Sequence, residues 1–379
     1  MHARKTRYRA VFARGGTSKA LLFHLADLPA DRAQWDAIFL SAMGSPDPYG
    51  RQLDGMGGGL SSLSKVCVIG PPTHPDAEVD YSFAQVQVQE ARVDWSGNCG
   101  NMLSAIGPFA VDEGLLGRAD GEAAVRIHNT NTKKLIVARF AVAGGRSVEQ
   151  GELVIPGVSG RGAPVRLDFL DPGGASTGKL LPTGRVRDTL DIPGLGRIDV
   201  SLIDAANACV FVAAEALGLR GNELPGELEA DPALLQRLAA IRAHGSVAMG
   251  LAATPEEAVA RRMIPLIAFV SAPQEARTLS GETLAAEQGD LVVRMISNGQ
   301  PHRALPVTGS LCTAVAAALP GSLPHALARQ ARSGPLRLSM PSGVLNVEAQ
   351  VEECDGALRA VQGSFYRTTR RLFEGSVYA

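Results

Sequence analysis

The chain carries the same order of predicted elements twice, and this internal repeat restricts its fold more than any other feature. Two apolar strands joined by a small-residue turn occupy residues 8–29 and again 198–219. In each half a third apolar strand, a helix that starts at glycines and a pair of alternating strands follow. The matching segments are 64–71 with 266–273, 93–116 with 306–327, and 125–140 with 336–351. The shared order indicates two domains of similar fold.

We therefore expect an α+β protein of two pseudo-symmetric domains, each a β-barrel-like sheet wrapped around one central apolar helix. The expected boundaries are 1–185 for the first domain, completed by 363–379, and 186–362 for the second. The two central helices should begin near residues 99–102 and 306–310. Both helix N-termini would then face one cleft between the domains, which is the expected active site.

Composition argues against several classes of partner. The chain has 379 residues, 45% of them hydrophobic, and a net charge of −1. No cluster of basic residues favours nucleic acid or an acidic membrane, and no apolar run approaches the ~20 residues that span a bilayer. The basic N-terminal stretch lacks the apolar core of a secretory signal. We therefore expect a cytoplasmic protein that binds neither nucleic acid nor membrane.

Cysteine and histidine usage predicts reduced thiols and no metal centre. The cysteines are Cys67, Cys99, Cys209, Cys312 and Cys354. This odd number without CxxC spacing is typical of a reducing compartment rather than of a disulfide framework. The histidines are scattered, without HxxxH or HxH spacing. We therefore expect no metal site.

The stretch GGASTGK at 173–179 matches the first seven positions of a phosphate-binding loop. The eighth position is Leu180, which lacks the hydroxyl that holds Mg²⁺. Pro182 also follows too soon for the long helix whose N-terminus would bind phosphate. The sequence therefore predicts an ordinary turn here and no nucleoside triphosphate site.

Cys99 lies between two Gly/Asn pairs in VDWSGNCGNM, where apolar periodicity predicts the start of a buried helix. A helix N-terminus offers free N–H donors and a partial positive charge, which attract anions and activate thiols. A buried structural cysteine beside an ordinary helix cap is the alternative.

Lys65 ends a glycine-rich loop, residues 43–65, just before an apolar strand. Such a loop can bring backbone close to a ligand, although a flexible surface loop is the plainer interpretation. In the repeat, Lys65 matches Ile267, so an amine stands where the other half has an apolar side chain. A desolvated lysine can act as a base, and an exposed lysine at a strand end is the alternative.

Several longer motifs carry a family resemblance. They are ARGGTSKALLF, GSPDPYGRQLDGMGGG, SSLSKVCVIGP, EVDYSFAQVQV, VDWSGNCGNM, GPFAVDEGL, KLLPTG and RRLFEG. Through them the chain resembles, nearly end to end, the PrpF-like isomerases. These include 2-methylaconitate cis–trans isomerases, methylitaconate isomerases and 4-oxalomesaconate tautomerases. The resemblance implies a fold similar to that of diaminopimelate epimerase, which agrees with the repeat.

The resemblance implies cofactor-free proton transfer on unsaturated di- and tricarboxylic acids, with Lys65 and Cys99 as the catalytic residues. Epimerases of this fold use two opposed cysteines, whereas the repeat sets Pro306 opposite Cys99. Proline can neither donate nor accept a proton, and Cys312 lies inside the second predicted helix, where packing is its expected role. A two-cysteine racemase mechanism is therefore not expected.

The remaining candidates are substrate-binding residues at turns and helix mouths. They are Ser18, Thr17, Gln52, Ser64, Asn98, Gly100, Asn101, Asn207, His302, Thr308, Gly309 and Ser310. Backbone N–H groups at the two helix mouths could hold the negative charge of a dienolate, as an oxyanion hole does. For Asn207, and for the pair His302 and Arg303, a simple turn or a solvated loop is the alternative.

The leading hypothesis for function is 2-methylaconitate cis–trans isomerisation, with a small unsaturated polycarboxylate as the substrate. A 4-oxalomesaconate tautomerase is the alternative within the same chemistry, since the same residues would serve it. A non-catalytic, carboxylate-binding accessory to a hydratase is a third hypothesis. Lys65 and Cys99 argue against the accessory, because binding a carboxylate needs charge but no thiol. The fold's relatives are commonly dimers, so the resemblance implies a homodimer.

Overall fold

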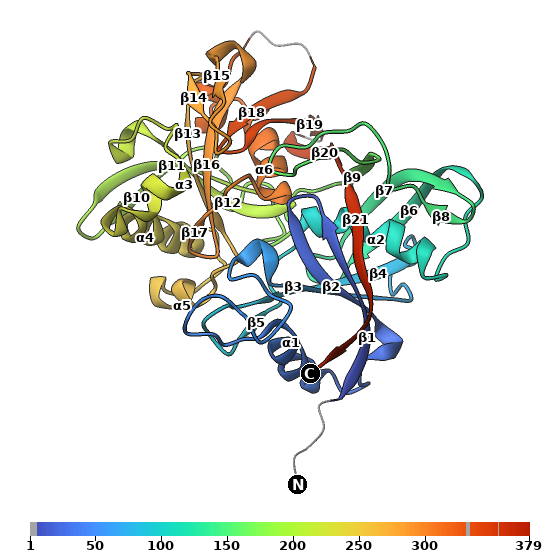
Figure 1. The fold of residues 1–379 in the computed structure, drawn as a ribbon. Helices are drawn as coiled ribbons and strands as arrows, with labels where there is room; N and C mark the ends of the chain where they lie inside the picture. Colours follow the sequence, from blue (N-terminus) through green and yellow to red (C-terminus); the bar gives the residue numbers. More distant parts are fainter. Residues whose placement is uncertain (1–5, 331–333, 355) are drawn as a thin grey trace. The chain divides into compact units, whose positions relative to one another are not determined.

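The structure, a computed structural model, describes residues 6–330, 334–354 and 356–379. The chain divides into two units, each with its own strands and helices (Figure 1). The first unit contains Met1–Leu167 and Tyr366–Ala379, and the second contains Asp168–Phe365. The chain leaves the first unit within strand β9 (Val165–Leu170) and returns within β20 (Ala357–Arg367). The first unit is therefore made from both ends of the sequence.

The sheet of the first unit carries the strands that matter for the site. Its strands besides β9 are β1 (Arg7–Gly15), β2 (Ser18–His24), β3 (Lys65–Gly70), β4 (Val79–Val86), β5 (Val93–Asp94), β6 (Gly121–Asn129), β7 (Lys134–Ala143), β8 (Arg146–Ser147) and β21 (Thr369–Tyr378). Neighbours pair in the order β21–β1–β2–β3–β4–β6–β7. The pairs β2/β3 and β4/β6 are parallel, and the others are antiparallel.

Helix α2 (Gly100–Asp112) is the central helix of this unit, and every residue from Gly100 to Val111 is buried. It packs against β1, β6, β7 and β8. Apolar and small residues occupy all of its faces, so no face is left for water, and this explains the burial. The prediction of a buried helix that starts near Asn101 is confirmed.

The outer helix of the first unit, α1 (Trp35–Met43), covers the sheet with Trp35, Ile38 and Phe39. It ends at Gly44, whose φ of 73° is a left-handed conformation that stops the helix. Three single-turn 3-10 helices complete the unit: η1 (Leu25–Asp27), η2 (Arg32–Gln34) and η3 (Ser61–Leu63).

The second unit repeats the pairing pattern with its own strands. Its strands besides β20 are β10 (Asp188–Ile192), β11 (Gly196–Ala205), β12 (Asn207–Ala213), β13 (Leu266–Ser271), β14 (Ala276–Arg277), β15 (Thr283–Leu284), β16 (Leu291–Ser297), β17 (Gln300–Pro301), β18 (Leu336–Met340) and β19 (Gly343–Cys354). From β11 to β12, β13, β16, β18 and β19 the pairings alternate between antiparallel and parallel. The same alternation runs from β1 to β7 in the first unit.

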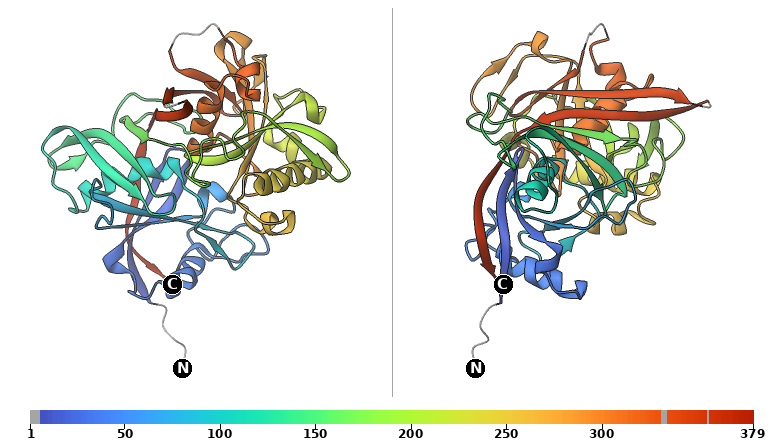
Figure 2. Two further views of the ribbon diagram at one scale, coloured as in Figure 1. Left: turned by 180° about the vertical axis from the view of Figure 1, so that it is seen from behind. Right: turned by 90° about the vertical axis from the view of Figure 1, so that its right-hand side faces the viewer.

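Helix α6 (Val307–Ala317) is buried along its whole length and packs on β11, β12 and β19. Its start confirms the prediction of a second helix N-terminus near residues 306–310. Helix α4 (Pro232–Ala248) lies across the outside of the sheet and packs on β10, β12 and β13 (Figure 2). The remaining short helices are α3 (Pro225–Glu229), α5 (Pro255–Ala260), α7 (Leu323–Leu327), η4 (Glu215–Leu217) and η5 (Ala286–Gln288).

Strands dominate both units and the helices are few, which confirms a mixed, sheet-based fold. Within the described ranges, no helix combines the length and apolar character that crossing a bilayer requires.

Candidate active site

The strand pair β3/β4 brings the first group of candidate residues onto one face of the sheet. The antiparallel register sets Lys65 opposite Gln85, Cys67 opposite Phe83 and Ile69 opposite Tyr81. Side chains alternate between the two faces of a sheet, so all three pairs lie on the same face. One row across the two strands therefore contains Lys65, Cys67, Tyr81, Phe83 and Gln85.

Lys65 is buried, with 7% of its surface exposed. Its Nζ donates a hydrogen bond of 2.5 Å to Oε1 of Gln85 and stands 5.0 Å from the centroid of the Phe83 ring. The ring face attracts an amine that carries positive charge. The alternative of an exposed lysine at a strand end is therefore excluded.

Cys99 occupies the N-cap position of α2, in extended backbone with φ −114°. Its carbonyl oxygen accepts the first helical hydrogen bond, 3.1 Å from the N–H of Leu103. The same oxygen accepts a bond of 3.4 Å from the hydroxyl of Tyr81. Cys99 is buried, with 8% of its surface exposed, and Cys67 is fully buried. The N-terminus of α2 thus lies against the face of the sheet that carries Lys65.

Cys67 and Tyr81 lie between Lys65 and the N-terminus of α2. The Tyr81 hydroxyl contacts the Cys67 thiol, and that thiol interacts electrostatically with both Cys99 and Lys65. Burial, reinforced by the neighbouring thiols, raises the pKa of Cys67 and of Tyr81 well above their usual ranges. Both therefore stay protonated at neutral pH.

The turn between β1 and β2 packs directly onto the first turn of α2. The side-chain oxygen of Asn101 accepts a bond of 3.3 Å from the N–H of Thr17, and its amide donates to Oγ1 of Thr17 at 3.1 Å. A Cβ on Gly16, which has a φ of +52°, would come within 2.2 Å of Oδ1 of Asn101. Glycine is therefore required at this position. Ser18 starts β2 beside this turn and is buried.

Arg367 joins this turn from the C-terminal segment. Its Nε donates to Oδ1 of Asn101 at 3.1 Å, and its side chain is buried. Burial lowers the pKa of Arg367 to about 10, so the guanidinium is still charged at neutral pH. A buried cation next to the positive end of α2 gives this region a field that favours anions.

Asn98 lies one residue before Cys99 and is also held by the fold. Its Oδ1 accepts a bond of 2.8 Å from the amide of Asn129, whose own Oδ1 accepts from the N–H groups of Asn131 and Thr132. Gly100, the first residue of α2, follows Cys99 directly. The segment around the thiol is therefore fixed from both sides.

The loop 43–65 is folded around the buried side chain of Gln52. Oε1 of Gln52 accepts from the N–H of Gly59 at 2.9 Å and from Oγ of Ser64 at 2.6 Å, and its amide donates to Oγ of Ser45. A Cβ on Gly57 would meet the Gln52 side chain at 2.3 Å. Here glycine lets the loop pack on itself, and Ser64 links the loop to Lys65.

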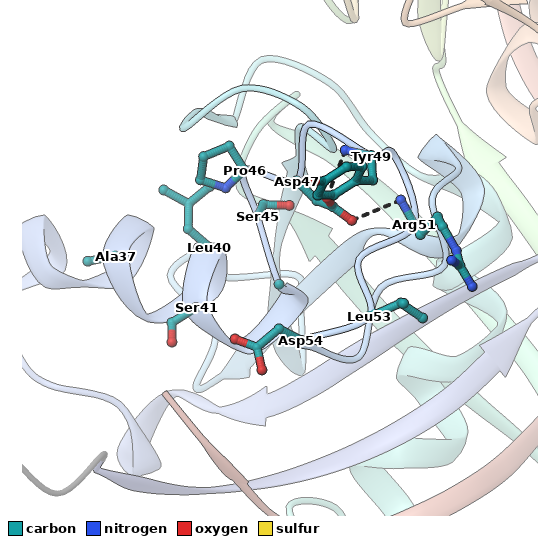
Figure 3. Close-up of a pocket in the computed structure, with 11 residues that line it drawn as sticks. Ala37, Leu40, Ser41, Ser45, Pro46, Asp47, Tyr49, Arg51, Leu53 and Asp54 are labelled. Carbon is teal, nitrogen blue, oxygen red and sulfur yellow. Dashed lines mark hydrogen bonds between the residues drawn. The ribbon is translucent and has the colours of Figure 1, made fainter.

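The same loop borders an open hollow of about 860 Å³ (Figure 3). Asp47 sits in its wall and accepts from the N–H groups of Tyr49 and Arg51, both at 2.9 Å. Hydrogen bonds from the backbone of Tyr49 and Gln52 lower the pKa of Asp47. The Asp47 carboxylate therefore serves to hold the loop, and the lining residues do not include Lys65 or Cys99.

In the second unit the candidates lie at a hairpin turn, a loop and a helix start. Thr308, Gly309 and Ser310 form the first turn of α6, and Pro306 is its N-cap residue. Oγ of Ser310 donates to the carbonyl oxygen of Pro306 at 3.0 Å. Asn207 begins β12 and is 2% exposed. Among the described residues, its buried Oδ1 has no hydrogen-bond donor.

Other residues weighed from the sequence have structural partners. Nδ1 of His302 accepts from the N–H of Ala304 at 3.2 Å, and Arg303 pairs with Glu229. The alternative of a solvated loop therefore fits Arg303. Cys312 is fully buried and donates to the carbonyl oxygen of Ile203 at 3.4 Å, which fits the expected packing role.

The GGASTGK stretch forms a loop whose donors are already engaged. The carboxylate of Asp204 accepts from the N–H groups of Ser176 and Thr177 at 2.8 and 2.6 Å, and from Oγ1 of Thr177 at 2.9 Å. The protein's own carboxylate thus binds where a phosphate loop would hold its ligand. This agrees with the prediction of a turn.

Sequence reasoning missed Gln85, Tyr81 and Arg367. Alternation in EVDYSFAQVQV indicates that Tyr81 and Gln85 share a face, but it does not reveal which strand lies opposite. Arg367 is 266 residues away from Asn101. No spacing rule connects such positions. Arg367 ends β20, and β21, which begins two residues later, pairs with β1 and so brings Arg367 to the turn that follows β1.

Comparison with known proteins identifies relatives over the full length. The family model described as PrpF protein matches residues 5–379. A 2-methyl-aconitate isomerase of Shewanella oneidensis is 39% identical, covering 97% of this chain and 96% of the relative. A 3-methylitaconate isomerase of Eubacterium barkeri is 41% identical, covering 98% and 97%. A 4-oxalomesaconate tautomerase of Pseudomonas putida is 38% identical, covering 98% and 96%.

Solved structures agree with these relatives. A methylitaconate-delta-isomerase is 40% identical with a TM-score of 0.81, covering 100% of this chain and 96% of the other. A hydroxyproline epimerase from Agrobacterium vitis shares the fold, with a TM-score of 0.56 at 12% identity over 98% of this chain and 92% of the other. Family model, relatives and structure lead to one assignment: the chain belongs to the PrpF family.

Proposed function

We propose that the protein is a cofactor-independent isomerase that moves an allylic proton in an unsaturated di- or tricarboxylic acid. The candidate reaction is the cis–trans isomerisation of 2-methylaconitate. Relatives named as isomerases of methylaconitate and methylitaconate, similar over nearly the whole chain, support this reading. The observation that carries it is the buried cluster in which Cys67 and Tyr81 connect Lys65 with Cys99.

The chemistry requires two proton transfers and a place for negative charge. Moving a double bond, or turning cis to trans, begins with removal of a proton next to an unsaturated carbon activated by a carboxylate. The resulting dienolate is then reprotonated. Lys65 and Cys99 supply the base and the acid. The backbone N–H groups of Gly100 and Asn101 would stabilise the dienolate.

The substrate's carboxylates need positive partners. The first turn of α2 and the buried guanidinium of Arg367 provide positive potential near Asn101. The proposed binding residues in the first unit are Ser18, Thr17, Gln52, Ser64, Asn98, Gly100 and Asn101. Those in the second unit are Asn207, His302, Thr308, Gly309 and Ser310. We also infer that the two units are versions of one fold, supported by their shared pairing order.

A 4-oxalomesaconate tautomerase is the second candidate, favoured by the relative of that name at 38% identity. Both reactions would use the same residues, so the substrate has to be identified by experiment. Proton NMR in D₂O with cis-aconitate, trans-aconitate, 2-methylaconitate and 4-oxalomesaconate tests the reading directly. We expect deuterium to enter 2-methylaconitate and its isomers to interconvert without added metal.

Two variants test the residues. Cys99→Ser and Lys65→Ala should each slow exchange of the allylic proton by at least about 10²-fold, the usual contribution of an acid or base. Cys354→Ser and Lys179→Ala make the same chemical changes away from the cluster and should keep wild-type exchange. Wild-type exchange in both Cys99→Ser and Lys65→Ala would exclude the assignment. Binding without exchange of any substrate would favour the accessory protein.

A further inference from the structure

The side-chain amide of Gln85 has one permitted orientation. Its Nε2 donates to the carbonyl oxygens of Ser61 at 3.0 Å and of Ser64 at 2.9 Å. A flipped amide would set its oxygen against these two acceptors and its NH₂ group against the amine of Lys65. Oε1 must therefore point at Lys65, and the side chain is fully buried, so water does not compete.

This fixed oxygen limits what the Lys65 amine can do. A lysine nitrogen at the end of a four-carbon stem otherwise rotates among many positions. Here one N–H direction is taken by Oε1 of Gln85 and the ring of Phe83 borders another side. The strand register sets Gln85 directly opposite Lys65, so both groups are held by backbone hydrogen bonds. Only a restricted set of directions remains for exchanging a proton with a substrate.

We propose that Gln85 is a positioning residue for proton transfer, whose amide oxygen orients the Nζ of Lys65 toward the substrate carbon. This rests on the proposed function only in assigning the proton transfer to Lys65. Gln85 acts through its hydrogen bond to Lys65 and does not itself exchange a proton with the substrate. It also ties Lys65 to the Ser61–Ser64 turn at the end of the glycine-rich loop, so loop and amine are held as one unit.

Two substitutions separate the two roles of this amide. Gln85→Met removes both the acceptor and the donor, whereas Gln85→Glu keeps an acceptor oxygen toward Lys65, sets its second oxygen against the carbonyl oxygens of Ser61 and Ser64, and adds a negative charge. If Gln85 orients Lys65, Gln85→Met should lower kcat by about 10- to 100-fold, as expected for a misplaced catalytic group, with KM nearly unchanged. Gln85→Glu should keep more of kcat than Gln85→Met, because it still presents an oxygen to Lys65. Gln350→Met, which removes an exposed amide in β19, is the matched control and should leave kcat and KM as in the wild type.

The measured outcomes decide between positioning and mere support of the loop. A support role depends on the donor alone, so Gln85→Glu would then lose at least as much of kcat as Gln85→Met, and that result would overturn the proposal. In the Lys65→Met background, Gln85→Met should cause no further loss of kcat, because Gln85 acts only through Lys65. Losses that multiply would also overturn it. Wild-type exchange in Lys65→Met would instead show that the proposed function is wrong in assigning the proton transfer to Lys65.

Discussion

At the scale of single residues, the turn between β1 and β2 shows how tightly the candidate site is built. Gly16 sits between the Asn101 side chain and the Arg367 side chain. A Cβ added to it would lie 2.2 Å from Oδ1 of Asn101 and 3.0 Å from Cδ of Arg367. Oδ1 of Asn101 in turn accepts hydrogen bonds from both Thr17 and Arg367. A small displacement at Gly16 therefore passes directly to the first turn of α2, next to Cys99.

Gly16→Ala should lower both stability and activity. Gly144 also has a positive φ, +60°, but no atom lies within 4 Å of its Cβ position, so Gly144→Ala isolates the cost of the backbone conformation. We expect about 1–2 kcal/mol for Gly144→Ala, with normal activity. Gly16→Ala should lose a further ~1–3 kcal/mol through the clash and slow allylic proton exchange by about 10²-fold. Denaturant unfolding measures the loss of stability, and the D₂O assay measures the loss of proton exchange. Equal losses in the two variants would contradict the packing argument.

At the scale of elements, one carboxylate at the end of α2 ties the helix to three strands. Glu113 accepts from Arg371 of β21 at 2.7 Å, from Arg9 of β1 at 2.9 Å, and contacts Nε2 of His24 in β2 at 3.2 Å. Burial opposes its ionisation, but the hydrogen bonds from Arg371 and His24, with the Arg371 charge, hold the pKa of Glu113 below its usual value.

A lowered pKa in the folded state makes this contact depend on pH in one direction. The stabilisation is present above the pKa of the unfolded chain, about 4.3 for a glutamate, and is lost as the pH falls through the lower folded value. Glu113→Gln should therefore lower Tm at pH 7, and the difference from the wild type should shrink toward pH 3. Glu122→Gln, at an exposed carboxylate in β6, should leave Tm unchanged at both pH values. A pH-independent deficit in Glu113→Gln would point to lost packing rather than lost charge.

At the scale of the whole molecule, the two ends of the chain meet in one sheet. β21 pairs with β1 along its length, from Arg7 with Tyr378 to Gly15 with Thr369, and the two strands run side by side (Figure 2). This pairing completes the unit that holds Lys65 and Cys99 and places Arg367 at Asn101. The last residues of the sequence therefore belong to the framework of the candidate site.

Two truncations test this dependence. A chain of residues 1–365 lacks β21, so the amides of β1 should lose protection in hydrogen exchange, and allylic proton exchange should fall below detection. A chain of residues 1–375 keeps the pairs from Ala10 with Gly375 to Gly15 with Thr369. It should retain protection in that part of β1 and retain activity. Normal protection of β1 in the shorter chain would show that β21 is dispensable.

Short-range signals in the sequence were sufficient for the elements. Helix periodicity after the Gly/Asn pairs predicts α2, and the repeat predicts the start of α6. The missing hydroxyl at Leu180 indicates that GGASTGK is not a phosphate loop. These inferences succeed because helix starts, strand alternation and turns depend on residues a few positions apart, which a sequence displays directly.

Only the tertiary structure decided which side chains surround the candidate catalytic pair. Gln85 meets Lys65 through strand register, Tyr81 meets Cys99 through the packing of α2 on the sheet, and Arg367 reaches Asn101 across 266 residues. Shifting a strand by one residue would turn its side chains to the opposite face without changing the local pattern. The sequence by itself therefore determined the elements, the family resemblance and Lys65 and Cys99 as candidates. Register and long-range packing, which no local spacing records, determined the contacts that orient them.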